Sequence, residues 1–449
     1  MTLPAQLIAD LNTHNINTTA LTEAHDTKPL TSIRYNTHKI TPPIATAPVA
    51  WCAQANYLSQ RPFFAHDPLW HAGAYYVQEA SSMLVGWALQ QLTTPTDTLT
   101  VLDACAAPGG KSTHLLSVLN ANSVLVSNEV IKTRVSVLLE NTTKWGHNNH
   151  IITNNDTTHF TALENTFNVL VIDAPCSGSG LFRKDIAALD EWSEANVNLC
   201  NQRQQRILHD LAPTLTPNGL LIYSTCSYST AENETIADQI IGMGFTSIPL
   251  LINQDWGITH TQSATHHAHG YRCMPHLTKG EGFYIACFRK NNDDDYTEQY
   301  SSKNRTNDVF KALDKKTSAS LTNYINDLSN VFSYAGGLHQ FPTERLPLLQ
   351  KISKQLYIKK AGLCIGELVG NDLIPHHDWA MSIHPPTTFN TVDIDLETAL
   401  TYLRKNNFTL PHAPKGWILL TYQHVCLGFI KNLGNRLNNY YPTNYRLLK

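Results

Sequence analysis

The chain has 449 residues, of which 42% are hydrophobic and 15% charged, and its formal net charge is −3. This length is too great for one hydrophobic core, so we expect two or three globular domains. No stretch reaches about 18 apolar residues and the Met1 end has no basic, apolar leader, so we expect neither a membrane span nor a signal peptide. Nine scattered cysteines do not suit a secreted disulfide framework, which favours free thiols and a cytoplasmic location.

The charge is distributed unevenly along the chain. Residues 1–300 contain 16 basic and 26 acidic residues, whereas residues 301–449 contain 17 basic and 10 acidic ones. From Ala399 onward there are seven basic residues and no acidic residue. A basic end on an otherwise acidic chain favours a polyanion-binding module attached to a different domain, with a merely solvated basic face as the alternative.

The predicted elements divide the chain into regions. A short amphipathic helix, a strand over 31–40 and an aromatic-rich stretch predict an N-terminal subdomain, residues 1–80. Strands then alternate with helices over residues 81–290, and apolar runs such as 167–174 and 280–290 predict strands buried on both faces of a parallel, doubly wound α/β sheet. The polar stretch 291–308 is typical of a linker, and residues 309–449 form a C-terminal region.

The stretch "DACAAPGGKST" (103–113) follows the first strand of this sheet and opens the next helix. Open α/β sheets bind ligands at this position. Small residues allow a ligand to approach the backbone, and the helix N-terminus can bind a carboxylate. The spacing is that of neither a phosphate loop nor a dinucleotide fingerprint. A glycine-rich helix cap without a ligand is the alternative.

Acidic residues end or follow the next three predicted strands: Glu129, Asp156 and Asp173. Glu129 is placed to accept hydrogen bonds from two ribose hydroxyls, and Asp156 to accept one from an adenine amino group. Each acid alone could equally be a turn residue or a helix cap. Together with the glycine-rich loop, they predict an adenosine ligand with a short charged tail and no phosphates, which fits S-adenosylmethionine.

Two cysteines lie just beyond apolar strands, Cys176 in "VLVIDAPCSGSG" (169–180) and Cys226 in "STCSYSTAENE" (224–234). Small polar neighbours at a strand end suit a reactive thiol, whereas a packed thiol would lie within the apolar run. We expect the cysteines elsewhere to be inert: Cys52, Cys200, Cys287, Cys364 and Cys426.

The motifs "DACAAPGGKST", "DAPCSGSGLFRKD" and "YSTCSYSTAENE", in this order, resemble those of the cytosine-5 RNA methyltransferases of the NOL1/NOP2/Sun family. The C-terminal stretch from "GW" (416–417) to "NNYYP" (438–442) resembles the bacterial RsmF branch, which modifies small-subunit ribosomal RNA. The resemblance implies a Rossmann-like class I S-adenosylmethionine-dependent methyltransferase sheet. It also implies a small α+β N-terminal RNA-binding subdomain over residues 1–80 and a C-terminal PUA-like RNA-binding domain.

The resemblance also implies roles for individual residues. Cys226 matches the nucleophile, which adds to C6 of cytosine and so activates C5, and Cys176 matches the second cysteine, which acts as a base or in product release. Asp173 is placed to hydrogen-bond the cytosine at N3 or its exocyclic amine. The positions that match cofactor-binding residues are Cys105, Ala106, Ala107, Pro108, Gly109, Gly110, Lys111, Glu129, Asp156 and Asp173.

The leading prediction is S-adenosylmethionine-dependent C5 methylation of a cytidine in RNA, with the 16S RNA of the small ribosomal subunit as substrate. The alternatives are a transfer RNA substrate and a non-catalytic RNA-binding ribosome-assembly factor. DNA is not expected, because DNA enzymes rely on the Pro-Cys motif of the fourth strand without a second cysteine. The sequence "THHAHGYRCMPH" (265–276) could suggest zinc, but no second ligand pair accompanies it, so we expect no metal and a substrate-facing loop. The sequence indicates neither the modified cytidine nor the oligomeric state.

Overall fold

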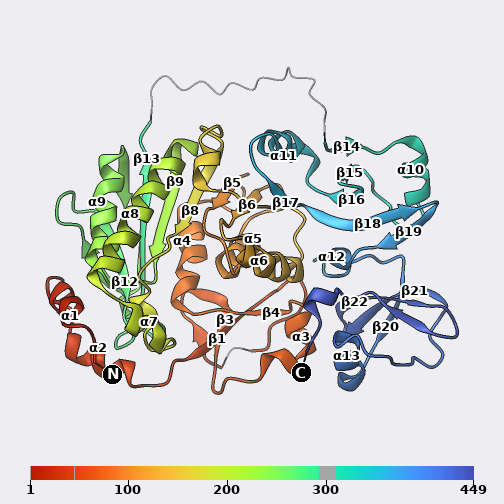
Figure 1. Ribbon diagram of the computed structural model, residues 1–449, viewed down its shortest axis with the longest axis horizontal. Coiled ribbons are helices and arrows are strands. Elements are labelled where there is room, and N and C mark those ends of the chain that lie inside the picture. The colour runs from red at the N-terminus through yellow and green to blue at the C-terminus, as the bar shows by residue number, and fades with distance from the viewer. Residues whose placement is uncertain (1, 45, 293–308, 449) are drawn as a thin grey trace.

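The computed structural model describes residues 2–44, 46–292 and 309–448, so most of the predicted linker 291–308 lies outside the described residues. Figure 1 shows a central sheet, with the N-terminal elements below it and the C-terminal third beside it. Within the described part of the chain, no helix is long and apolar enough to cross a membrane.

The central sheet contains ten strands: β5 Thr100–Asp103, β6 Val124–Asn128, β7 His150–Thr153, β8 Phe167–Asp173, β9 Leu215–Thr225, β10 Phe245–Ile248, β11 Thr259–Gln262, β12 His269–Cys273, β13 Phe283–Lys290 and β17 Ile358–Ala361. Their order is β11-β12-β13-β9-β8-β5-β6-β7-β17, and β10 pairs with β13. Only β7, β6, β5, β8 and β9 are parallel. The expectation of a wholly parallel sheet was therefore wrong. The strand over 280–290, β13, runs antiparallel to β9 because it follows β12 through a short connection rather than a crossover helix.

Helices cover both faces of the sheet: α4 Leu84–Leu92, α5 Gly110–Val118, α6 Lys132–Trp145, α8 Glu194–Leu211 and α9 Glu234–Gly242. The short helix α7 Ile186–Glu191 packs instead on the N-terminal helices. Alternation along β8 explains its uninterrupted apolar sequence. Leu170 and Ile172 pack with residues of α8 and α9, whereas Val169 and Val171 pack with residues of α4 and α5. Because the five parallel strands point the same way, their carboxyl ends meet along one edge of the sheet.

The N-terminal region contains three helices and a four-stranded sheet in the order β2-β3-β1-β4. These elements are α1 Ala5–Asn12, α2 Thr18–His25, β1 Thr31–Tyr35, β2 Pro48–Val49, β3 Cys52–Leu58, α3 Pro68–His71 and β4 Tyr75–Val77. The strand expected over 31–40 ends at Tyr35, because the backbone turns at Asn36, whose carbonyl accepts from Lys39 N at 3.0 Å. Fully buried Arg34 donates to Thr113 Oγ1 at 2.7 Å, so this sheet supports the first turns of α5.

The C-terminal region forms two further sheets, β14-β15-β16-β18-β19 and β20-β21-β22-β23. The elements of the first part are β14 Lys311–Ala312, α10 Lys315–Leu321, β15 Val331–Tyr334, β16 Gly337–Gln340, α11 Leu346–Ser353, β18 Leu363–Val369, β19 Asp372–Pro375 and α12 His377–Ala380. Those of the second part are β20 Asn390–Asp393, α13 Leu396–Leu403, β21 Gly416–Tyr422, β22 Val425–Asn432 and β23 Leu437–Asn439.

Both C-terminal parts pack against the rest of the chain. Strand β17 leaves the first part and pairs antiparallel with β7, which extends the central sheet by one strand. In the second part, Tyr402 and Ala399 of α13 share a buried cluster with Ile33 and Tyr75 of the N-terminal sheet. The basic stretch from Ala399 therefore begins inside a buried helix, and a truncation there would expose this apolar core.

Candidate active site

The loop between β5 and α5 lies at the carboxyl edge of the parallel strands. Gly109 has a φ of +107°, in the left-handed region that favours glycine, and α5 begins at the next residue. The loop folds back on itself, with Gly109 N donating to Ala106 O at 2.8 Å. The first amide groups of α5 have no acceptor within their own helix, so they are available to an anionic group. This geometry suits the carboxylate end of the predicted cofactor.

Asp103, at the end of β5, is a fully buried acid. Its Oδ2 accepts from Ser112 Oγ at 2.6 Å, whereas Oδ1 is buried without a partner among the described residues. Burial raises the pKa of Asp103 from 3.8 to about 7. A buried acceptor without a partner is costly unless a ligand donates to it, so Asp103 supports a cofactor with a donor group beside this loop.

Glu129, just beyond β6, is 3% exposed. Its Oε1 accepts from Ile131 N at 2.8 Å, and its Oε2 lies 3.5 Å from Arg134 Nη1. A carboxylate has about four lone-pair sites, so both oxygens can still accept from ribose hydroxyls. These contacts orient the Glu129 carboxylate and leave lone pairs on both of its oxygens for further hydrogen bonds.

Asp156 caps the 3₁₀ helix Thr157–Phe160, with Oδ1 accepting from Thr158 N at 3.1 Å. This backbone hydrogen bond lowers the pKa of Asp156. Its Oδ2 lies 3.5 Å from Arg206 Nη2. Asp156 therefore has the alternative role given for each acid, that of a helix cap. Its hydrogen bond with an adenine amino group stays a prediction.

Replacing Glu129 with alanine is expected to weaken S-adenosylmethionine binding about 10- to 10⁴-fold, because one or two charge-assisted hydrogen bonds of about 1.5–3 kcal/mol each are lost. Isothermal titration calorimetry with the purified protein measures the change. The exposed acid Glu164 provides the control, since Glu164→Ala should bind normally. An unchanged dissociation constant for Glu129→Ala would remove this residue from the cofactor site.

The two predicted reactive cysteines lie together. Strands β8 and β9 are parallel neighbours with Asp173 opposite Ser224, so the loops that follow them meet. Cys176 Sγ and Cys226 Sγ are 3.0 Å apart, and Gly180 N donates to Cys226 O at 2.8 Å. Both cysteines are free thiols.

The two thiols differ in their electrostatic surroundings. The hydrogen bond with Cys226 and burial raise the pKa of Cys176 well above its ordinary value. Cys176 therefore remains protonated at neutral pH, and its S–H can donate to the Cys226 sulfur 3.0 Å away. The reacting form of a cysteine nucleophile is the thiolate, which accepts hydrogen bonds.

Asp173 joins the cysteines to the cofactor loop. Lys111 Nζ lies 2.7 Å from Asp173 Oδ2, and Ser224 Oγ donates to Oδ1 at 2.9 Å. Burial alone would lower the pKa of Lys111, but the adjacent Asp173 raises it above its ordinary value, so the pair is ionic. The Asp173 side chain is 29% exposed and can accept another hydrogen bond from a ligand.

Sequence analysis missed Glu232, a fully buried acid in the 3₁₀ helix Thr230–Glu232. It accepts from Ser177 N at 2.9 Å, Ser227 Oγ at 2.6 Å and Gln204 Nε2 at 3.1 Å. Ser177 and Ser227 each follow one of the two cysteines, so this carboxylate joins the two loops. The sequence feature that could have identified Glu232 is an acidic residue within a stretch rich in serine and threonine hydroxyls.

The histidine-rich stretch 265–276, which was expected to be a loop, contains a strand. Its residues His269–Cys273 form β12, which pairs with both β11 and β13. Among the residues that the structure describes, no group of three or more His, Cys, Asp or Glu side chains could hold a metal ion.

A five-stranded parallel core with a glycine-rich ligand loop after its first strand and acids at successive strand ends defines the class: a Rossmann-like, S-adenosylmethionine-dependent methyltransferase. Three family profiles match the chain: the N-terminal domain of 16S rRNA methyltransferase RsmF over residues 3–80, 16S rRNA methyltransferase RsmB/F over 90–289, and the methyltransferase RsmF PUA domain over 389–447.

Relatives agree with these profiles. Ribosomal RNA small subunit methyltransferase F of Shewanella loihica is 30% identical, over 82% of this chain and 77% of its own length. The Shewanella woodyi protein of the same name is 28% identical, over 93% and 91% of the two chains. The structure of a methyltransferase homologue from Pyrococcus horikoshii covers 64% of this chain and all of its own, with 25% identity and a TM-score of 0.52. The chain belongs to the ribosomal RNA small subunit methyltransferase F family, which confirms the predicted family, fold class and PUA domain.

Proposed function

We propose that the protein transfers a methyl group from S-adenosylmethionine to C5 of a cytidine in 16S ribosomal RNA, through a covalent bond between Cys226 Sγ and C6. The observation that carries this proposal is the pair of sulfurs 3.0 Å apart, next to the Lys111–Asp173 ion pair. The names of the relatives support the small-subunit RNA as substrate. When bound, S-adenosylmethionine supplies an electrophilic methyl group, and loop 104–111 with Glu129 and Asp156 would hold it.

The first chemical step is addition of the Cys226 thiolate to C6, which breaks the aromaticity of the ring and makes C5 an enamine carbon that can accept a methyl group. Asp173 is ionised beside Lys111 and therefore acts as an acceptor, which favours a hydrogen bond from the exocyclic amine of the cytosine. Ser224 and Lys111 fix the orientation of this carboxylate.

After methyl transfer, the C5 proton must leave and the bond between Cys226 and C6 must break. A Cys176 that is protonated in the resting enzyme cannot accept the C5 proton, so this proton passes to water. It can donate its S–H to the departing Cys226 sulfur, which stabilises the thiolate as a leaving group. Of the two roles expected for Cys176, product release is therefore the one that its raised pKa favours.

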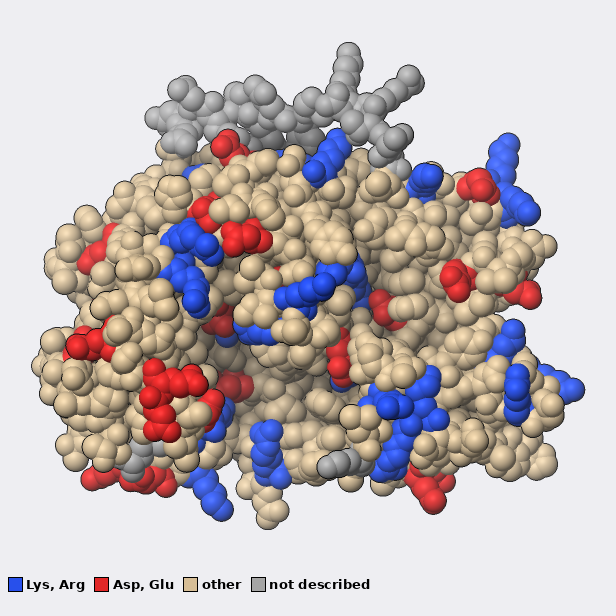
Figure 2. Space-filling view, viewed as in Figure 1, with Lys and Arg blue, Asp and Glu red and all other residues tan. Residues whose placement is uncertain are grey.

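The distribution of charge supports an RNA partner. Figure 2 shows Lys and Arg side chains gathered near the C-terminal end and α13 on this face, and acidic side chains gathered near α7. Cations on the PUA domain would attract phosphates, and neutralised phosphates release counterions. A substrate in the small ribosomal subunit implies a cytoplasmic location.

Mapping 5-methylcytosine in RNA from a strain that lacks the gene tests this function. We expect one cytidine of 16S RNA to lose its methyl group, as measured by bisulfite sequencing. The wild-type gene should restore it and a Cys226→Ala gene should not. A mark lost from transfer RNA instead would favour the transfer RNA alternative. If no 5-methylcytosine is lost from any RNA, a non-catalytic assembly factor would be favoured.

A further inference from the structure

The N-terminal segment packs directly on the two loops that carry the cysteines. Its apolar side chains form one buried cluster with residues from the loops after β8, β9 and β12: Leu3, Leu7, Leu11, Ile16, Leu21, Phe182, Tyr228 and Met274. Tyr228 lies two residues after Cys226, and Phe182 lies six residues after Cys176. Helix α1 is therefore fixed against the active site although it lies outside the central sheet.

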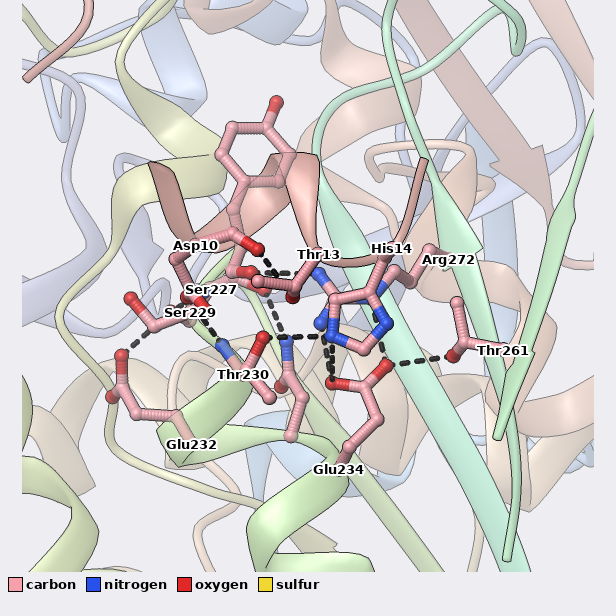
Figure 3. Close-up of polar contacts among 12 residues, drawn as sticks. Asp10, Thr13, His14, Ser227, Ser229, Thr230, Glu232, Glu234, Thr261 and Arg272 are labelled. Carbon is pink, nitrogen blue, oxygen red and sulfur yellow. Dashed lines mark hydrogen bonds and ion pairs between the residues drawn. The ribbon is translucent and has the colours of Figure 1, made fainter. Parts of the chain in front are cut away.

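Two polar side chains from this segment reach the turn that follows Cys226 (Figure 3). Asp10 Oδ2 accepts from Thr230 N at 2.8 Å, and His14 Nε2 lies 2.8 Å from Thr230 Oγ1. Burial lowers the pKa of His14, so the ring is neutral at neutral pH and hydrogen-bonds as an imidazole. Thr230 thus has both its backbone N–H and its hydroxyl bound by the N-terminal segment.

The opposite side of the same turn is held by the central domain. Glu234 forms a buried ion pair with Arg272 of β12, and Thr261 Oγ1 donates to Glu234 Oε1 at 2.6 Å. Arg272 Nη1 also donates to Tyr228 O at 2.6 Å. The turn is therefore fixed on one side by β11 and β12 and on the other by α1.

The position of this turn matters for the chemistry because the turn ends in Glu232. Thr230 opens the 3₁₀ helix that ends at Glu232, and Glu232 binds Ser177 and Ser227 beside the two cysteines. Movement of Thr230 would therefore shift the carboxylate that joins the loops of the two cysteines. None of the residues predicted to hold the cofactor belongs to this turn.

We propose that Asp10 and His14 are positioning residues that hold the turn Thr230–Glu232 and, through it, the Cys226 nucleophile. The inference rests on the proposed function in one respect, namely that Cys226 is the nucleophile. Because the two residues act through Thr230 rather than on substrate or cofactor, their loss should slow the chemical step and leave binding unchanged.

The test compares Asp10→Ala, His14→Phe and Thr230→Val with the wild type. Thr230→Val keeps the shape and the backbone N–H of residue 230 and removes only the hydroxyl that contacts His14. We expect kcat to fall about 10- to 100-fold in each variant, because small misplacements of reacting groups have effects of this size. The KM for RNA and the dissociation constant for S-adenosylmethionine should not change.

Asp10→Asn is the rescue variant, because its side-chain oxygen can still accept from Thr230 N, so its kcat should be close to that of the wild type. Gln6→Ala, an exposed change on the same helix, is the control and should be silent. Unchanged kcat in folded Asp10→Ala and Thr230→Val proteins would overturn the inference. So would a loss confined to the KM for RNA, or an Asp10→Asn protein as slow as Asp10→Ala.

Cys226→Ala is measured in the same assay to separate the two proposals. If Cys226→Ala still methylates RNA, the proposed covalent role of Cys226 fails, and the positioning role fails with it. If Cys226→Ala is inactive while the Asp10 and Thr230 variants are fully active, only the positioning role fails. Should Asp10→Ala not fold, Thr230→Val and Asp10→Asn still decide, since both keep the volume of the side chain.

Discussion

Cys226→Ala is expected to bind RNA and S-adenosylmethionine normally and to methylate nothing. Without the sulfur, C6 of the cytosine receives no nucleophile and C5 stays part of an aromatic ring, so kcat should fall by roughly 10⁴-fold or more. The measurement is transfer of a radiolabelled methyl group to substrate RNA. Thermal unfolding serves as the control for folding, because the change removes one part-exposed sulfur.

Cys176→Ala should fail at a later step. It keeps Cys226 and can form the bond to C6, but the departing sulfur then lacks the S–H donor now 3.0 Å away. We expect an enzyme–RNA species that survives denaturing electrophoresis, whereas the wild type releases its product. The double variant should lose this species. A stable species with Cys226→Ala but not with Cys176→Ala would mean that the two roles are reversed.

Glu232→Ala is expected to lower both stability and activity. The change removes the acceptor of Ser177 N and one of the two acceptors of Gln204 Nε2, which keeps its bond to Pro175 O. Each unsatisfied buried N–H costs about 1–3 kcal/mol, so the free energy of unfolding should fall by about 2–6 kcal/mol. Because the loops of Cys176 and Cys226 lose their shared acceptor, kcat should fall as well. Denaturant unfolding and methyl transfer measure the two effects.

Glu232→Gln separates these two effects. The glutamine keeps the volume and one oxygen acceptor, but its amide nitrogen cannot accept from a serine hydroxyl. We expect a smaller loss of stability than in Glu232→Ala and a clear loss of kcat. The exposed Glu164→Ala change is the matched control for removal of one acid. A Glu232→Ala protein as stable and as active as the wild type would show that the carboxylate does not join the loops.

Structural features that depend only on short stretches of sequence could be predicted. The apolar runs gave the strands, and the strand ends located Asp173, Cys176 and Cys226 along one edge of the sheet. The glycine-rich motif predicted the loop before α5, in which the structure gives Gly109 a positive φ. Each of these inferences needs only the period of a strand and the chemistry of the residues that follow it.

Features that depend on long-range contacts could not be predicted. The contact of Asp10 with Thr230 joins residues 220 positions apart. Glu232 in sequence is an ordinary loop acid, and its burial depends on how two loops meet. The antiparallel direction of β13 and the addition of β17 to the sheet follow from chain connections, which hydrophobic pattern does not encode. The same holds for the packing of α13 on the N-terminal sheet.

Peptide mapping of the species trapped by Cys176→Ala tests the covalent role of Cys226 most directly. The trapped complex is digested with protease and nuclease, and the peptide that carries a nucleotide is sequenced by mass spectrometry. We expect a methylated cytidine attached to Cys226. A nucleotide attached to another cysteine, such as Cys105, or methylation by Cys226→Ala without any adduct, would contradict this role.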